Sequence, residues 1–316
     1  YHDSRSNPFG LLKHVGEDCP GALQIVQSER LAEYQHPGPA QIQWMTLNEL
    51  RERLALLRED AAAFRLVTDQ GRMSLAGAQA KTALYFDGRR WGVPAGRMPT
   101  SHILKPCIPG FDGLVENEHL CQGIAARCGL PAARSFVLDL DEPVIVVERF
   151  DRLPHPDPAR ILRRVHQEDM CQALSRLPSD KYQESGGPGV ETIVKLLRSV
   201  STNVPEDVGR FVDANIFNYL IGGTDAHAKN YSLLLGANRQ VRLSPLYDLS
   251  TQLPYVDRIP QRVAMKIGRR YDIGSITAAD WQGLARHCKL DETQMVDRVR
   301  ALAEMLPDHI VDARDQ

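Results

Sequence analysis

The chain has 316 residues, 43% of them hydrophobic, so it is long enough to bury a large core as one two-lobed domain or as two domains. Its 38 Lys and Arg nearly balance its 40 Asp and Glu, and the formal net charge is −2. This balance excludes binding of nucleic acid through overall positive charge. Only a local basic patch or a partner could bring the chain to DNA.

The six cysteines include no C-x-x-C pair, and the sequence shows no secretory leader. It also has no apolar run of the roughly 18 residues that a transmembrane helix needs. A protein of the reducing cytoplasm with no membrane association is therefore expected.

The first half of the chain is predicted to be mixed. A capping box from Thr46 to Glu49 begins a helix that continues to Leu57. The elements that follow are expected in the order strand, strand, helix, strand, at Lys81–Asp87, Ser101–Lys105, Leu114–Cys128 and Pro143–Val147. Together they predict a small lobe of sheet and helix over residues 1–152.

The second half is predicted to be mainly helical. Apolar residues at helical spacing indicate helices at His166–Leu174, Val190–Ser199, Val208–Leu220, Ala278–Cys288 and Glu292–Leu306. The Pro- and Gly-rich stretch Pro178–Gly189 is expected to be a loop, and Tyr231–Leu235 with Val241–Leu243 a hairpin. The predicted fold is thus α+β and two-lobed, like a protein kinase, with an all-helical second lobe over residues 153–316 that carries one catalytic hairpin.

The residues most typical of chemistry follow the third of these helices. In Gly223-Thr-Asp-Ala-His-Ala-Lys-Asn230, an Asp precedes an Asn at the five-residue offset of a kinase catalytic loop. Asp225 would orient and deprotonate a substrate hydroxyl, and Asn230 would hold Mg²⁺. After the hairpin, Asp248 stands where a kinase keeps its metal-binding Asp, although the motif is not Asp-Phe-Gly.

Candidates for the phosphate-binding groups lie in the first half. Lys105 ends a predicted strand, where its charge could reach the α- and β-phosphates. Either Glu116 or Glu118, on the next helix, could orient that lysine, and the sequence does not choose between them. The small-residue stretch from Ser74 to Thr82 could bring backbone N–H groups to phosphate oxygens, although an ordinary turn fits it equally well.

Six segments together resemble the HipA kinases, bacterial serine/threonine kinases that act as toxins of toxin–antitoxin pairs. In order they are Ser74–Thr82, His102–Pro106, Glu116–Glu118, Val147–Arg152, Thr224–Asn230 and Pro245–Asp248. The resemblance spans about residues 7 to 248.

This resemblance implies roles for individual residues. ATP and Mg²⁺ would be the cofactors, Asp225 the catalytic residue, and Asn230 and Asp248 the metal ligands. Ser74 matches the position that HipA kinases phosphorylate on themselves, where a charge of about −2 would displace the covering loop. The remaining nucleotide contacts would be the covering loop (Ala76, Gly77, Ala78, Gln79, Ala80, Lys81), the phosphate-binding Lys105, the adenine hinge (Glu148, Arg149, Phe150) and the loop residues His227, Ala228 and Lys229.

The resemblance also implies partners. These are a HipB-like helix-turn-helix antitoxin, operator DNA bound through the antitoxin complex, and a protein substrate that could be an aminoacyl-tRNA synthetase. The basic run Arg262, Lys266, Arg269 and Arg270 could contact DNA phosphates there, although a solvated face is the favoured interpretation.

Two departures from the family pattern stand out. Ala80 occupies a position where these kinases commonly carry Glu. The N-terminal module of the small lobe, expected before Asn7, is not in the sequence, which predicts a truncated chain, disorder, or a split system in which another protein supplies the module.

Three other hypotheses stay open. The chain could phosphorylate a small molecule, or it could be a catalytically silent DNA corepressor, although all the catalytic side chains are present. It could also be a metal hydrolase using Asp225, His227 and Asp248, but no H-E-x-x-H motif supports this.

Overall fold

The computed structural model describes residues 8–35, 41–64, 66, 69, 75, 79–156 and 162–314. The chain divides into two compact units, residues 1–115 with 135–167, and residues 116–134 with 168–316. The division therefore does not fall at residues 152/153 as predicted. Residues 116–134 belong to the second unit because the helix they contain contributes Cys121, Ile124 and Ala125 to the core of that unit.

The first unit is built on a six-stranded sheet with the strand order β1-β3-β2-β4-β6-β5. Its neighbouring strands are all antiparallel. The strands are β1 (Gln41–Met45), β2 (Thr82–Phe86), β3 (Trp91–Ala95), β4 (His102–Pro106), β5 (Ser135–Leu138) and β6 (Val144–Glu148). Shorter elements accompany them: α1 (Pro8–Val15), α2 (Leu31–Gln35), β7 (Arg152–Pro154) and β8 (Leu162–Arg164).

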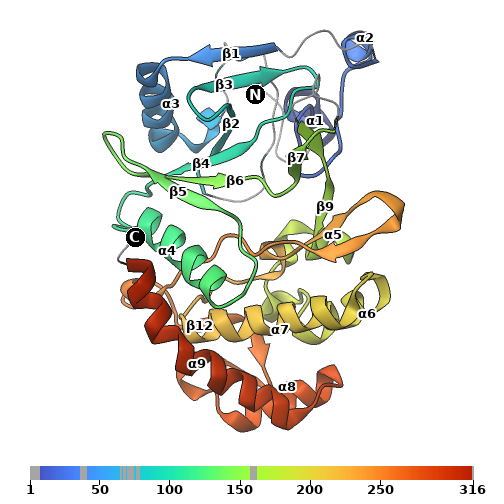
Figure 1. The fold of residues 1–316 in the computed structure, drawn as a ribbon, viewed down its shortest axis with the longest axis vertical. Helices are drawn as coiled ribbons and strands as arrows, with labels where there is room; N and C mark the ends of the chain where they lie inside the picture. Colours follow the sequence, from blue (N-terminus) through green and yellow to red (C-terminus); the bar gives the residue numbers. More distant parts are fainter. Residues whose placement is uncertain are drawn as a thin grey trace. The chain divides into compact units, whose positions relative to one another are not determined.

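Helix α3 (Leu47–Glu59) covers one face of this sheet (Figure 1). It begins at the predicted capping box, in which Thr46 and Glu49 exchange hydrogen bonds. Its apolar residues Leu50, Leu54 and Leu57 pack on the sheet. The sheet residues in this core include Leu84, Leu104, Val144 and Val146. Since side chains alternate along a strand, the neighbours of Leu104 face the other side of the sheet.

A buried ionic cluster joins the segment after α1 to the end of β6. The carboxylate of Asp18 contacts Arg149, Arg152 and Arg164, and Arg149 and Arg152 also contact Asp151. Burial raises the pKa of Asp18, but the three guanidinium groups lower it by more, so that it lies well below the usual 3.8. The folded state therefore favours the ionised carboxylate.

Asp18→Asn is expected to lower the free energy of unfolding by about 3–5 kcal/mol, because it leaves buried arginines without their counter-charge. Urea denaturation measures this. Asp141→Asn is the matched control, since Asp141 is 73% exposed and lies 3.6 Å from Arg51, and it should cost about 1 kcal/mol or less. Equal stability of the two variants would contradict the prediction.

The stability that Asp18 contributes depends on pH, because its pKa is lower in the folded state than in the unfolded state. The contribution of Asp18 is complete at pH values above the unfolded pKa near 3.8, and it is lost as the pH falls below that value. Acid unfolding of Asp18→Asn should accordingly be less steep than that of the wild type in this range.

The second unit is mainly helical. Its helices are α4 (Leu114–Arg127, which starts in the first unit), α5 (Met170–Ala173), α6 (Val190–Val200), α7 (Val204–Leu220), α8 (Ala278–Cys288) and α9 (Glu292–Arg314). Helix α6 packs on α7 and α8, and α9 packs on the same two helices. Arg298 of α9 and Asp213 of α7 form two hydrogen bonds of 2.7 and 2.8 Å. These helices surround a large apolar core.

Two small sheets complete the second unit. The predicted hairpin forms from β10 (Ser232–Leu235) and β11 (Val241–Leu243), and β9 (His166–Asp169) adds a third strand beside β10. A second hairpin, β12 (Arg262–Ile267) with β13 (Arg270–Asp272), was not predicted. The α+β class is confirmed, but the second unit is not all-helical beyond its catalytic hairpin.

Candidate active site

The first turn of helix α7 contacts the hairpin formed by β10 and β11. The carboxylate of Asp207, which is fully buried, accepts the backbone N–H of Leu243 at 3.0 Å and contacts Arg242. Arg210, one turn later, donates to the carbonyl oxygen of Ser244 at 3.0 Å. The start of this helix thus fixes the chain that leads to Asp248.

The end of α7 leads into the loop with Asp225. Gly222 follows with φ +68°, a backbone conformation that side chains rarely tolerate. A Cβ at Gly223 would lie 2.5 Å from Oδ1 of Asn218. Two glycines are therefore needed for the sharp turn that carries the chain from the helix into the loop.

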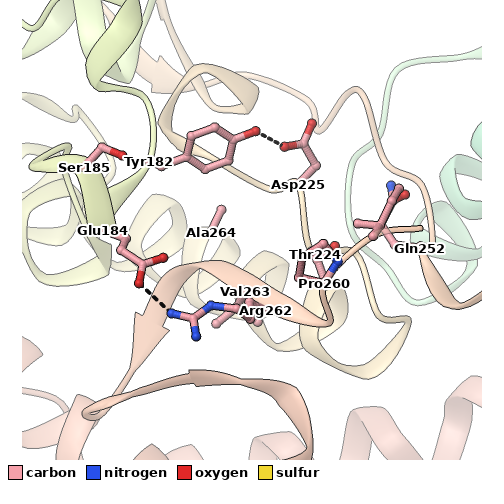
Figure 2. Close-up of a pocket in the computed structure, with 11 residues that line it drawn as sticks. Tyr182, Glu184, Ser185, Thr224, Asp225, Gln252, Pro260, Arg262, Val263 and Ala264 are labelled. Atoms are coloured by element: carbon pink, nitrogen blue, oxygen red, sulfur yellow. Dashed lines mark hydrogen bonds and ion pairs between the residues drawn. The ribbon is translucent and has the colours of Figure 1, made fainter. Parts of the chain in front are cut away.

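Asp225 is an exposed carboxylate held by one strong hydrogen bond. The hydroxyl of Tyr182 donates to Oδ1 of Asp225 at 2.5 Å (Figure 2). Within the loop, the N–H of His227 donates to the carbonyl oxygen of Asp225 at 2.7 Å, and the N–H of Asn230 donates to that of His227 at 2.9 Å. An exposed, oriented carboxylate can accept a proton from an incoming hydroxyl.

Asn230 has the features of a metal ligand. It is 8% exposed, and its Oδ1 has no hydrogen-bond partner among the described residues. A buried amide oxygen without a partner costs free energy, which a cation can offset. Asn230 therefore fits the Mg²⁺ role predicted for it.

Asp248 is exposed and has φ +54°, a left-handed conformation that is unusual outside glycine. Leu246, two residues before it, exchanges backbone hydrogen bonds with Pro131 and Ala133. Thr251, three residues after it, exchanges 2.8 and 2.9 Å hydrogen bonds with the Asn117 amide of α4. Contacts on both sides thus fix its unusual conformation.

The segment that carries Asp248 contacts the loop of Asp225, because the hydroxyl of Tyr247 donates to the carbonyl oxygen of Lys229 at 2.7 Å. Burial lowers the pKa of His227, and the negative charges of Asp225 and Asp248 oppose this shift. The loop from Thr224 to Asn230 thus meets the residue before Asp248, while the roles of Asp225 and Asp248 stay predictions.

Lys229 and Ala228 have other contacts. The ammonium group of Lys229 lies 2.5 Å from the carboxylate of Asp169, and Ala228 is fully buried. Asp169 also caps α5 by accepting N–H groups of Cys171 and Gln172. The helix predicted at His166–Leu174 is wrong because its first half is β9, which pairs with β10.

In the first unit, Lys105 is buried, and it lies on the sheet face opposite α3. Its antiparallel partner is Ile145, whereas Leu104 faces the α3 core. The same face carries Ala83, Ile103 and Val147. Ser135, which pairs with Val147, also lies on this face, so the face has mixed polarity.

Arg149, the middle residue of the predicted adenine hinge, is engaged elsewhere. The Arg149 side chain is buried in the ionic cluster described above, so it stabilises the fold, and only its backbone could meet a nucleotide. Glu148 and Phe150 are half-buried.

In the covering loop, Gln79, Ala80 and Lys81 are described and half-buried, whereas Ser74, Ala76, Gly77 and Ala78 lie outside the described residues. On α4, Glu118 is buried and accepts a hydrogen bond from Gln122 at 3.0 Å, while Glu116 is exposed.

An open pocket of about 530 Å³ lies beside Asp225. Tyr182, Thr224 and Gln252 line it together with Val263 and Ala264 of β12 (Figure 2). The Glu184 carboxylate and the Arg262 guanidinium meet across it at 2.6 Å. An acceptor could approach Asp225 from this pocket.

Two residues of the basic run have acidic partners. Arg262 pairs with Glu184, and Arg270 lies 3.2 Å from Asp280. These pairs favour the solvated face over phosphate contacts. In the part of the chain that the structure describes, no cluster of three or more His, Cys, Asp or Glu could hold a metal, and no helix could span a membrane.

Sequence reasoning missed Tyr182 and Asp169. Tyr182 lies 43 residues before Asp225, in the Pro- and Gly-rich loop. An aromatic residue in such a loop is a weak signal by itself.

The second unit is helical and carries an Asp–Asn loop followed by a further Asp. This arrangement is typical of the large lobe of protein kinases. Residues 73–310 match the model of a protein family that is described as "HipA-like C-terminal domain". The chain therefore belongs to the HipA-like family.

Individual relatives agree with this assignment. Y4mE of Sinorhizobium fredii, which carries a kinase name, is 38% identical over 90% of this chain and 66% of its own length. The serine/threonine-protein kinase toxin HipA of Shewanella oneidensis is 28% identical over 98% of this chain and 71% of its own. The chain thus spans about two thirds of the length of these relatives.

Among solved structures, the complex of HipA, HipB and operator DNA from Shewanella oneidensis matches with a TM-score of 0.84 at 26% identity. The match covers 99% of this chain and 73% of the HipA-like chain of that complex.

Proposed function

We propose that the protein is an ATP- and Mg²⁺-dependent serine/threonine protein kinase of the HipA type. The observation that carries the proposal is one loop with an exposed Asp225 carboxylate and an Asn230 Oδ1 that has no partner among the described residues. Tyr247, next to Asp248, donates to the Lys229 carbonyl oxygen of the same loop. A general base and two oxygen ligands for one metal are the groups that phosphoryl transfer requires.

Asp225 would accept the proton of a serine or threonine hydroxyl. The hydroxyl oxygen forms a bond to the γ-phosphorus, the bond from that phosphorus to the β-γ bridging oxygen breaks, and ADP leaves with the electron pair. Asn230 and Asp248 would hold Mg²⁺, which supplies positive charge for the phosphate oxygens when it is bound. Lys105 would contact the α- and β-phosphates, and its place on the sheet face that α3 leaves uncovered supports this role.

The remaining site assignments are part of the same proposal. The backbone of Glu148, Arg149 and Phe150 would contact adenine, and the loop from Ala76 to Lys81 would cover the phosphates. Of the two glutamates on α4, the buried Glu118 is favoured over the exposed Glu116 as the carboxylate that orients Lys105.

Biological roles follow from the family and are proposed with it. The chain would be the toxin of a toxin–antitoxin pair, bound to a HipB-like antitoxin on operator DNA as a corepressor. Its substrate would be a cytoplasmic protein such as an aminoacyl-tRNA synthetase. The match to a HipA–HipB–operator complex supports the first of these roles.

The test is incubation of phosphatase-treated protein with Mg²⁺ and γ-labelled ATP, followed by mass spectrometry. Phosphate is expected on Ser74, and Ser74→Ala should lose most of the label. Ser179→Ala, which removes an exposed loop serine, is the control and should keep it.

Other outcomes have defined meanings. No transfer to Ser74 or to any added protein, with ATP still bound, would favour the silent corepressor. Label on a small molecule alone would favour the small-molecule kinase.

A further inference from the structure

The ring of Tyr182 contacts two neighbouring side chains. The edge of the ring meets the imidazole of His227 with 5.2 Å between centroids, and the Lys181 ammonium lies 4.9 Å from the ring centre. The carbonyl oxygen of Tyr182 accepts the N–H groups of Ser185 and Gly187 at 3.1 and 3.0 Å. The hydroxyl is therefore aimed by its surroundings.

The loop that carries Tyr182 is anchored to two other segments. The carbonyl oxygen of Lys181 accepts the N–H of Ala228, in the catalytic loop, at 3.1 Å. On the other side, Oε1 of Gln183 accepts the N–H of Lys266, in β12, at 2.8 Å. These anchors on the two neighbouring residues fix the backbone of Tyr182 beside Asp225.

The two carboxylate oxygens of Asp225 differ in their hydrogen bonding. Oδ1 accepts the tyrosine hydroxyl, while Oδ2 has no hydrogen bond from any described residue and points away from Tyr182 in Figure 2. Rotation about the last torsion of an aspartate is only weakly restricted, so an exposed carboxylate needs a donor to fix its plane. Burial, together with the hydrogen bond to Asp225, raises the pKa of Tyr182, which keeps this hydroxyl protonated as a donor.

We propose that Tyr182 is a positioning residue for phosphoryl transfer: it holds Oδ1 of Asp225 so that Oδ2 is presented to the acceptor hydroxyl. This inference rests on the proposed function, in which Asp225 is the base. Tyr182 lines the pocket from which the acceptor would approach, but in this scheme its hydroxyl acts on the reaction only through Asp225. Its effect comes from alignment of the base, which phosphoryl transfer depends on strongly.

The test is Tyr182→Phe, which keeps the ring and its contacts and removes only the hydroxyl. With phosphatase-treated protein, γ-labelled ATP and myelin basic protein as the probe acceptor, kcat should fall by about 10- to 100-fold. The KM for ATP and the thermal midpoint should stay close to wild type, because the ring still packs on His227. A purely structural role would lower the thermal midpoint instead and leave kcat of the folded enzyme unchanged.

Tyr219→Phe is the matched control. Tyr219 is a half-buried tyrosine at the end of α7 whose ring packs edge-on against Trp281, away from Asp225. It should keep the wild-type kcat.

Two results would overturn the role of Tyr182. One is a kcat for Tyr182→Phe within about twofold of wild type, and the other is a faster reaction, which would mean that the hydroxyl occupies the acceptor's place. Transfer by Asp225→Ala at the wild-type rate would instead overturn the proposed function.

Discussion

Replacement of Asp225 by alanine is expected to reduce phosphoryl transfer by about 10²- to 10⁴-fold, the range for loss of a general base. ATP binding should stay close to wild type, since the proposed nucleotide contacts lie on other residues. The variant should also fold normally, because Asp225 is exposed and its side chain accepts one hydrogen bond, from Tyr182. Single-turnover transfer from γ-labelled ATP, with nucleotide binding measured by calorimetry, separates the two effects.

Asp257→Ala is the control for this experiment. Asp257 is another exposed aspartate of the same unit, and its replacement should leave both transfer and binding unchanged. If Asp225→Ala lost nucleotide binding to the same extent as transfer, Asp225 would be a binding group and its assignment as the base would be wrong.

Replacement of Asp248 by asparagine is expected to affect a different step. Asparagine has nearly the same shape and tolerates the left-handed backbone at φ +54°, so the change removes only the charge. Two unit charges 4 Å apart attract each other by about 4 kcal/mol near a protein surface. Loss of one carboxylate from the Mg²⁺ site should therefore weaken Mg²⁺-dependent nucleotide binding by about 100-fold or more.

Calorimetric titration with ATP, in Mg²⁺ and separately in EDTA, measures this effect. The wild type should bind more tightly with Mg²⁺, and Asp248→Asn should bind nearly equally in both. Asp272→Asn, at an exposed position in β13, is a control that should behave like the wild type. An Mg²⁺ effect of wild-type size in Asp248→Asn would remove Asp248 from the metal site.

Much of the local structure could be predicted because the signals are local. The capping box at Thr46 begins α3, and α6 and α8 were predicted to within a residue by apolar periodicity. The hairpin of β10 and β11 was predicted for the same reason, since its two strands are close neighbours in the sequence.

The predictions were wrong where contacts between segments far apart in the sequence determine the structure. Residues His166–Asp169 have helical spacing but form a strand, because β10 lies beside them and pairs with them. The hairpin β12–β13, which turns at Gly268 with φ +60°, was missed. Helix α4 joins the second unit because its apolar side packs in that core, and this cannot be seen in its own sequence.

The sequence by itself determined the family and the order of the motifs, because both depend only on which residues follow one another along the chain. Only the tertiary structure decided which groups meet: Tyr182 with Asp225, Lys229 with Asp169, and Arg149 with Asp18. Hydrogen bonds and ion pairs act over a few ångströms, so residues 43, 60 and 131 positions apart interact only after packing has brought them together.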